Sequence, residues 1–88
     1  MTTYYKTVGI SLSDINILGA FAYTPPKPDK IKSCYEYYTK TGRFDRSIIV
    51  DENNVLRDGY VAYLIARMMG LSNIKVVKAI EREQAKIL

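Results

Sequence analysis

The feature that most constrains the fold is one continuous segment, residues 48–77, which alternates patterns typical of strands and of a helix. It opens with a β-branched run, and the polar turn DENN followed by the apolar pair VL predicts that this strand returns as a short hairpin. A helix is expected from Gly59 to Met69, and Gly70 stands where a left-handed residue ends a helix. The Val-rich stretch SNIKVVKAI then predicts a further strand.

The residues before this segment add a strand and a second helix. The stretch YYKTVGISL, Tyr4 to Leu12, is rich in aromatic and β-branched residues, so it is expected to be a strand, and AFAY is expected to be a second short one. The prolines of TPPKPD break regular structure, and a helix is predicted from Pro28 to Thr41, ended by Gly42. The stretch EREQAKIL has good helix formers and predicts a short helix. The expected fold class is α+β, with helices packed on a small mixed β-sheet in a single domain, residues 1–88.

Two apolar stripes at helical spacing predict which sides of these helices face the core. The stripe of the first helix consists of Ile31, Cys34, Tyr35 and Tyr38. The stripe of the second helix consists of Val61, Leu64, Ile65, Met68 and Met69. Cys34 is therefore expected to be a buried structural thiol, since the chain has no histidine that would activate it as a nucleophile.

Composition limits the chemistry that the chain supports. The 88 residues carry a net charge of +4, one cysteine and no histidine. The commonest general base and the commonest metal ligand are thus both missing. No apolar run is long enough to span a membrane, no signal peptide is recognised, and a lone cysteine fits a reducing cytoplasm. A chain of this size has marginal stability, which a dimer interface would improve.

Basic residues gather in one stretch and form a candidate nucleic-acid surface. They are Lys27, Lys30, Lys32, Lys40, Arg43 and Arg46. The alternative is a solvated basic face that only aids solubility. Three acidic residues near the predicted hairpin, Asp51, Glu52 and Asp58, have the oxygen ligands that a divalent metal takes, but turns are commonly acidic and no metal is expected.

The chain has eight tyrosines, more than so small a core can take up. Tyr37 lies off the apolar stripe of its helix. Tyr60, Tyr63 and Arg67 follow one another at i, i+3 and i+7, on a side of the second helix away from its predicted core stripe. Tyrosine and arginine are enriched at interfaces. These four residues are therefore expected to contact a protein partner or a second copy, the alternative being tyrosines packed at the domain edge.

The segment SIIVDENNVLRDGYVAYLIARMMGLSNIKVV resembles the ParB/sulfiredoxin-like family, in particular its ParB N-terminal-type domain. The shared pattern is an apolar strand, Val-Asp and a turn, a short strand, Asp-Gly at the helix entry, an alanine in the helix, and a Val-rich strand after a glycine. Upstream, VGISLSDI and PDKIKSCYEYYTKTGRFDRSIIV are similar to the opening strand and first helix of the family. The resemblance implies the corresponding fold for most of the chain.

The residues after the glycine at the helix entry differ from those of the family, and these are the residues on which the function of the family depends. Arginines after the glycine hold a triphosphate in nucleotide-binding members, and a cysteine there is catalytic in sulfiredoxins. Here Gly59 is followed by Tyr60, Val61 and Ala62, none of which is charged. Asp58 is expected to cap the helix. A weak anion site at Arg57, Asp58 and Gly59 is all that the motif implies, and no cofactor is expected.

Together these observations favour a small non-catalytic binding or accessory protein that acts by contact with a protein or a nucleic acid. The alternatives are a small nucleotide-dependent enzyme of this fold, a kinase or NTPase, and a DNA-binding accessory. By analogy, a short domain of this kind suggests a phage or mobile-element protein that modulates a nucleic-acid-processing machine.

Overall fold

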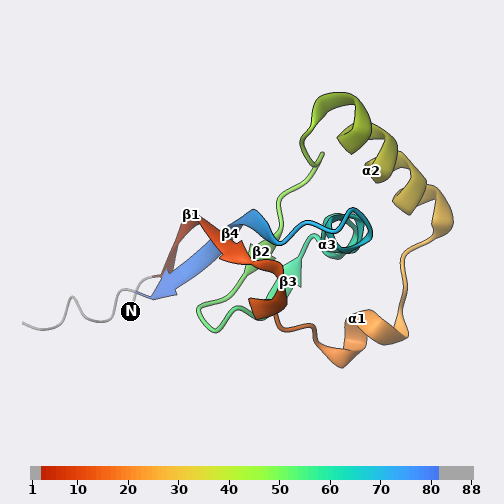
Figure 1. Ribbon diagram of the computed structural model, residues 1–88. Coiled ribbons are helices and arrows are strands. Elements are labelled where there is room, and N and C mark those ends of the chain that lie inside the picture. Colours follow the sequence, from red (N-terminus) through yellow and green to blue (C-terminus); the bar gives the residue numbers. More distant parts are fainter. Residues whose placement is uncertain (1–2, 82–88) are drawn as a thin grey trace, which may run out of the picture.

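A four-stranded mixed sheet and three helices make up residues 3–81, the part of the chain that the computed structural model describes (Figure 1). The elements in chain order are β1 (Thr3–Ser11), a single 3-10 turn η1 (Leu12–Asp14), α1 (Gly19–Tyr23), α2 (Pro28–Thr41), β2 (Ile49–Val50), β3 (Leu56–Asp58), α3 (Tyr60–Met68) and β4 (Asn73–Glu81). The expected fold class, α+β with a small mixed sheet, is confirmed. The helix expected for residues 81–88 lies outside the described residues, apart from Glu81, which ends β4.

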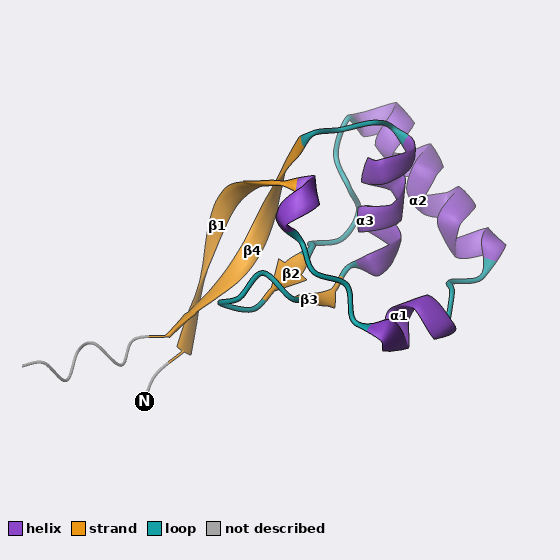
Figure 2. Cartoon of the chain, turned by 60° about the horizontal axis from the view of Figure 1, so that its bottom comes forward, coloured by secondary structure: helices purple, strands orange, loops and turns teal. Residues whose placement is uncertain are grey.

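The sheet has the strand order β1-β4-β2-β3, so β4 joins its two halves. On one side β4 pairs antiparallel with β1 along nine residues. On the other side it pairs parallel with β2, where Ile49 is opposite Val77 and Val50 is opposite Lys78. Figure 2 shows the helices gathered around the β2–β3 half, while the far end of β1 and β4 extends away from them. None of the helices in residues 3–81 has the length and apolar character needed to cross a bilayer.

The core lies between α3, α2 and the β2–β3 half of the sheet. Its most deeply buried large side chains are Leu56, Ile65, Val50, Val76 and Cys34. Removing such side chains from water is the main source of stability for a chain of this size. The predicted burial of Cys34 is confirmed.

The predicted helix Pro28–Thr41 is confirmed at both ends. Proline occupies its first position, where its missing N–H costs no hydrogen bond, and Gly42 has a φ of 74° and donates its N–H to the Tyr38 carbonyl. The second predicted helix begins one residue later than expected, at Tyr60, and Gly70 after it has a φ of 72°.

The prediction of a strand at Ala20–Tyr23 is wrong, because this stretch belongs to the short helix α1. Alanine favours a helix, and none of the strands in residues 3–81 pairs with this stretch. The Thr24 hydroxyl donates to the Ala20 carbonyl at 2.7 Å and helps to close the turn. One side chain of α1, Phe21, packs against the core.

The predicted core stripe of α3 is wrong at its last residues. Met68 and Met69 are exposed, Met68 to 65 %, whereas Tyr63 is buried. Ala62 and Ala66, which the predicted stripe omits, have no exposed surface at all. Because α3 is covered by the sheet and also by other helices, burial extends around most of its circumference, and one apolar stripe does not describe it. On α2, Tyr35 is likewise more exposed than its stripe predicts.

Gly59 joins β3 to α3 in a conformation that other residues rarely adopt. Its φ is 87°, and it is the N-cap of α3. A Cβ at this position would lie 2.5 Å from the Ser47 carbonyl oxygen and 2.8 Å from the Ile48 Cα. Both atoms belong to the backbone, so they have no side-chain rotamer with which to move aside. The absence of a side chain at residue 59 thus permits close contact between two segments of the chain.

We expect Gly59→Ala to lower the free energy of unfolding by about 3 kcal/mol or more, since left-handed strain adds to a backbone clash. Gly42→Ala is the matched control, because Gly42 has a similar φ but open space around it. Its cost is expected to be about 1–2 kcal/mol, the strain alone. Urea unfolding measures the free energy of unfolding of both variants. Equal decreases would show that the close contact with Ser47 and Ile48 adds nothing to the effect of the substitution at residue 59.

Candidate functional site

A cleft of about 500 Å³ opens at the start of α3. This volume is within the range of small-ligand sites. Its walls come from α1 and the segment after it, from the start of α2, from the loop before β2, and from the β3–α3 junction. The lining residues are Phe21, Thr24, Pro25, Pro26, Lys27, Lys30, Arg46, Asp58, Gly59, Tyr60 and Val61.

Two helices begin at this cleft. Among the described residues, no side chain caps the N-terminus of α3, where Gly59 is the N-cap, or that of α2, where Lys27 is the N-cap. The first backbone N–H groups of a helix have no partner within it, and the helix dipole places partial positive charge there. The prediction that Asp58 caps α3 is wrong, because its carboxylate accepts the Gly59 N–H at 2.8 Å instead, one residue before the helix. Negative ligands are therefore favoured where α2 and α3 begin.

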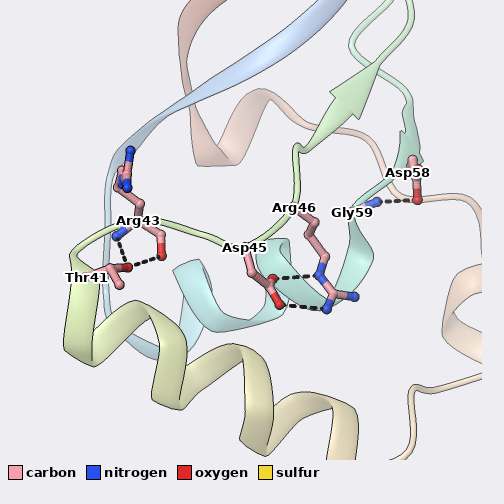
Figure 3. A network of polar contacts seen from close by, with 6 residues as sticks. All are labelled: Thr41, Arg43, Asp45, Arg46, Asp58 and Gly59. Atoms are coloured by element: carbon pink, nitrogen blue, oxygen red, sulfur yellow. Dashed lines mark hydrogen bonds and ion pairs between the residues drawn. The ribbon is translucent and has the colours of Figure 1, made fainter.

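Three cations line the cleft, and all belong to the basic stretch recognised in the sequence. Lys27 and Lys30 come from the start of α2, and within the described residues neither has an ion pair. Arg46 comes from the loop before β2 and lies between α2 and the start of α3 (Figure 3). Lys32 and Lys40 of α2, together with Arg43, do not line the cleft. The structure thus divides the six predicted nucleic-acid contacts into two groups of three.

Arg46 is held in place by its neighbour in the sequence. The Asp45 carboxylate accepts two hydrogen bonds from its guanidinium, at 2.8 and 3.0 Å. These bonds lower the pKa of the Asp45 carboxyl below its usual range. Because Asp45 already offsets much of its charge, Arg46 attracts an added anion less strongly than an unpaired arginine would.

Aromatic side chains form one wall of the cleft. The ring of Phe21 from α1 lies 5.1 Å from that of Tyr60, the first residue of α3. Tyr60 in turn stacks with Tyr63 at 6.2 Å, and the Arg67 guanidinium lies 6.0 Å from the Tyr63 ring centre. The predicted row of Tyr60, Tyr63 and Arg67 is thus present, but α1 covers its first member, and Tyr63 is only 7 % exposed. Arg67 stays exposed, and so does Tyr37 on α2.

The remaining predicted residues lie elsewhere. Arg57 does not line the cleft, because its guanidinium reaches the Asp51 carboxylate at 3.0 Å. Asp51 also accepts the N–H groups of Asn53 and Val55, which stabilises the β2–β3 turn. Within residues 3–81 no three acidic or cysteine side chains gather as metal ligands, so Asp51 and its acidic neighbours form no such group there. Burial and the nearby charge of Asp45 raise the pKa of the Cys34 thiol, which disfavours the reactive thiolate.

Five lining residues are not among the predicted site residues, namely Phe21, Thr24, Pro25, Pro26 and Val61, the last of which is predicted to face the core. The proline pair predicts a break between elements but gives no sign that the segment folds back over the start of α3. In the structure the stretch Gly19–Tyr23 is the helix α1, and its Phe21 ring lies on Tyr60. Because the sequence predicts a strand for this stretch, it does not predict the wall of the cleft that α1 forms.

Tyr63→Ala is expected to lower the free energy of unfolding by about 3–5 kcal/mol, as truncation of a buried aromatic side chain does. Tyr37→Ala is the matched control, because Tyr37 is exposed, and its cost is expected to stay below about 1 kcal/mol. Denaturant unfolding of the two variants provides the measurement. Similar small costs would mean that Tyr63 contributes to a surface and not to the core.

Comparison with solved structures identifies the fold. No family model and no curated protein matches the sequence. Two solved structures of a pNOB8-like ParB N-domain match 98 % of this chain with TM-scores of 0.75 and 0.74, each at 20 % sequence identity. The chain spans about a third of the length of those chains, 34 % and 31 %. Residues 3–81 thus have the fold of a ParB N-domain.

Proposed function

We propose that the chain is a non-catalytic binding domain that holds a nucleic-acid strand by its phosphates in the cleft at the start of α3. The observation that carries the proposal is the position of Lys27, Lys30 and Arg46 around the uncapped start of this helix. Backbone N–H groups at a helix start and nearby cations are the usual partners of a phosphate. Under this proposal the domain is an accessory to a nucleic-acid-processing machine, of the kind that phages and mobile elements carry.

The distribution of charge favours a strand over a nucleoside triphosphate. A triphosphate concentrates several negative charges and needs several cations within a few ångströms. The first turn of α3 supplies none, Asp58 adds a negative charge, and Arg46 is already paired. A strand carries one charge per phosphate at spaced positions, which the exposed Lys27 and Lys30 suit better. Tyr23, just before the lining residue Thr24, is 87 % exposed and offers a ring for base stacking.

A protein partner is the second candidate. Its support is a set of exposed side chains of types enriched at interfaces. These are Tyr35 and Tyr37 on α2, Arg67 and Met68 on α3, and Met69 directly after it. A pull-down that Tyr37→Ala weakens, with no effect of changes in the cleft, would favour this candidate over the first.

Binding of a fluorescein-labelled oligonucleotide of about 20 nucleotides, followed by anisotropy, tests the proposal. The double variant Lys27→Glu, Lys30→Glu is expected to lose at least about tenfold in affinity, because two attractions to phosphates become repulsions. The slope of log affinity against log salt should also become shallower, by roughly 0.7 for each phosphate of a single strand that the variant no longer neutralises.

The control is Lys32→Glu, Lys40→Glu, which changes the charge of the same helix by the same amount outside the cleft. It is expected to retain most of the affinity. Equal losses in both double variants would show a diffuse attraction without a site, and an unmodified protein that does not bind either DNA or RNA would refute the proposal.

Calorimetry with ATP and CTP in the presence of Mg²⁺ tests the distinction between strand and nucleotide. We expect no binding of either nucleotide in the micromolar range, because the cations near α3 are few and partly neutralised. Low-micromolar binding that Lys30→Glu abolishes would assign the cleft to a nucleotide instead.

A further inference from the structure

The strand β1 leaves one edge of the sheet unpaired among the described residues. It lies at the end of the strand order, next to β4 only, and Figure 2 shows its outer side facing away from the helices. Its nine residues keep a regular register with β4, without a bulge. Proteins usually protect such an edge with prolines, bulges or several charges. Here the only charged residue of the strand is Lys6, and Tyr5, Thr7 and Gly9 are exposed or partly exposed as well.

The hydrogen bonds at the end of the strand show which backbone groups face outward. The Leu12 N–H donates to the Ser72 carbonyl at 2.8 Å, one step beyond the pair Ser11–Asn73. Along an antiparallel pair, residues bonded to the partner strand alternate with residues whose N–H and C=O point away from it. The even-numbered residues of β1 therefore bond to β4. The odd-numbered ones, including Tyr5, Thr7 and Gly9, direct their N–H and C=O to the free edge.

We infer that a second copy of the chain pairs on this edge, β1 against β1 in antiparallel orientation, with the two-fold axis at Thr7. This register places residue 3 opposite residue 11, so it uses all nine residues of each strand. It also places Lys6 opposite Val8 of the other copy. A two-fold axis at Lys6 would instead set the two lysines directly opposite each other, which is unfavourable.

Side chains on the outer edge fit the same register. Tyr5 of each copy comes to lie opposite Gly9 of the other. Tyr5 is 62 % exposed, and the space where Gly9 would carry a Cβ has no atom within 4 Å. An aromatic ring across from a glycine compensates for the missing side chain and stabilises the strand pair. No residue of β1 lines the cleft, so this pairing is independent of the proposed function.

Sedimentation equilibrium over a range of concentrations tests the pairing. The unmodified chain is expected to rise in average mass from one chain to two. Thr7→Lys should weaken the dimer by roughly five- to tenfold, because it sets two like charges against each other on the axis. Thr7→Val, which keeps a β-branched side chain, should associate like the unmodified protein. Circular dichroism checks that both variants are folded, as expected at a position on the sheet edge.

A cross-link tests the register. In the proposed dimer the Cα atoms of the two copies of residue 7 are about 5.5 Å apart, within disulfide range. The two copies of residue 9 are roughly 14 Å apart. Under mild oxidation Thr7→Cys should therefore form a covalent dimer and Gly9→Cys should not, with the buried Cys34 present in both. A chain that stays monomeric at all concentrations, a dimer that Thr7→Lys leaves unchanged, or equal cross-linking of the two cysteine variants would overturn the inference.

Discussion

The contact between Gly59 and the backbone of Ser47 and Ile48 is the constraint on which the candidate site depends. It holds the start of α3 directly against the segment that carries Arg46. The backbones of residue 59 and of residues 47–48 lie so close that no side chain fits at residue 59. The same close packing brings the two segments together at the cleft and requires a residue that tolerates a left-handed conformation. A glycine that serves backbone packing thereby also brings helix N–H groups and a cation into one place.

The cations that line the cleft do not belong to α3, the helix whose N-terminus lies at the cleft. Lys27 and Lys30 belong to the start of α2, and Arg46 belongs to a loop. Ala62, which follows Gly59 by three positions in the stretch where nucleotide-binding members of the resembled family carry arginines, is fully buried in this protein. A cation there would have to enter the packed core or displace it, at considerable cost. Because the start of α3 is packed too closely to carry a cation at residue 62, the positive charge of the cleft comes from other segments.

The sequence predicted best those features that depend on local chemistry. The helix Pro28–Thr41 was predicted at both ends because proline and glycine fix backbone geometry where they stand. The sequence does not predict α1, because its five residues form too short a pattern to distinguish a helix from a strand. The sequence does not predict the burial of Tyr63, because burial there depends on which elements cover α3, and a periodic pattern within one helix does not contain that information. The grouping of Lys27 and Lys30 with Arg46 likewise required the tertiary fold.

The sheet topology also has a consequence for how the chain folds. The residues that pair between β1 and β4 are 62 to 78 positions apart in the sequence, and β1 has no other partner strand in the described chain. Pairing residues this far apart in the sequence closes a long loop. The loss of chain entropy comes before the stabilising contacts form, which slows folding. The helix α2 and the β2–β3 hairpin depend on contacts between residues close in sequence, so they are expected to form before β1 pairs with β4. In a refolding chain, β1 is therefore expected to gain its hydrogen-bonded partner later than the elements with local contacts, and until then its backbone groups are open to pairing with other chains.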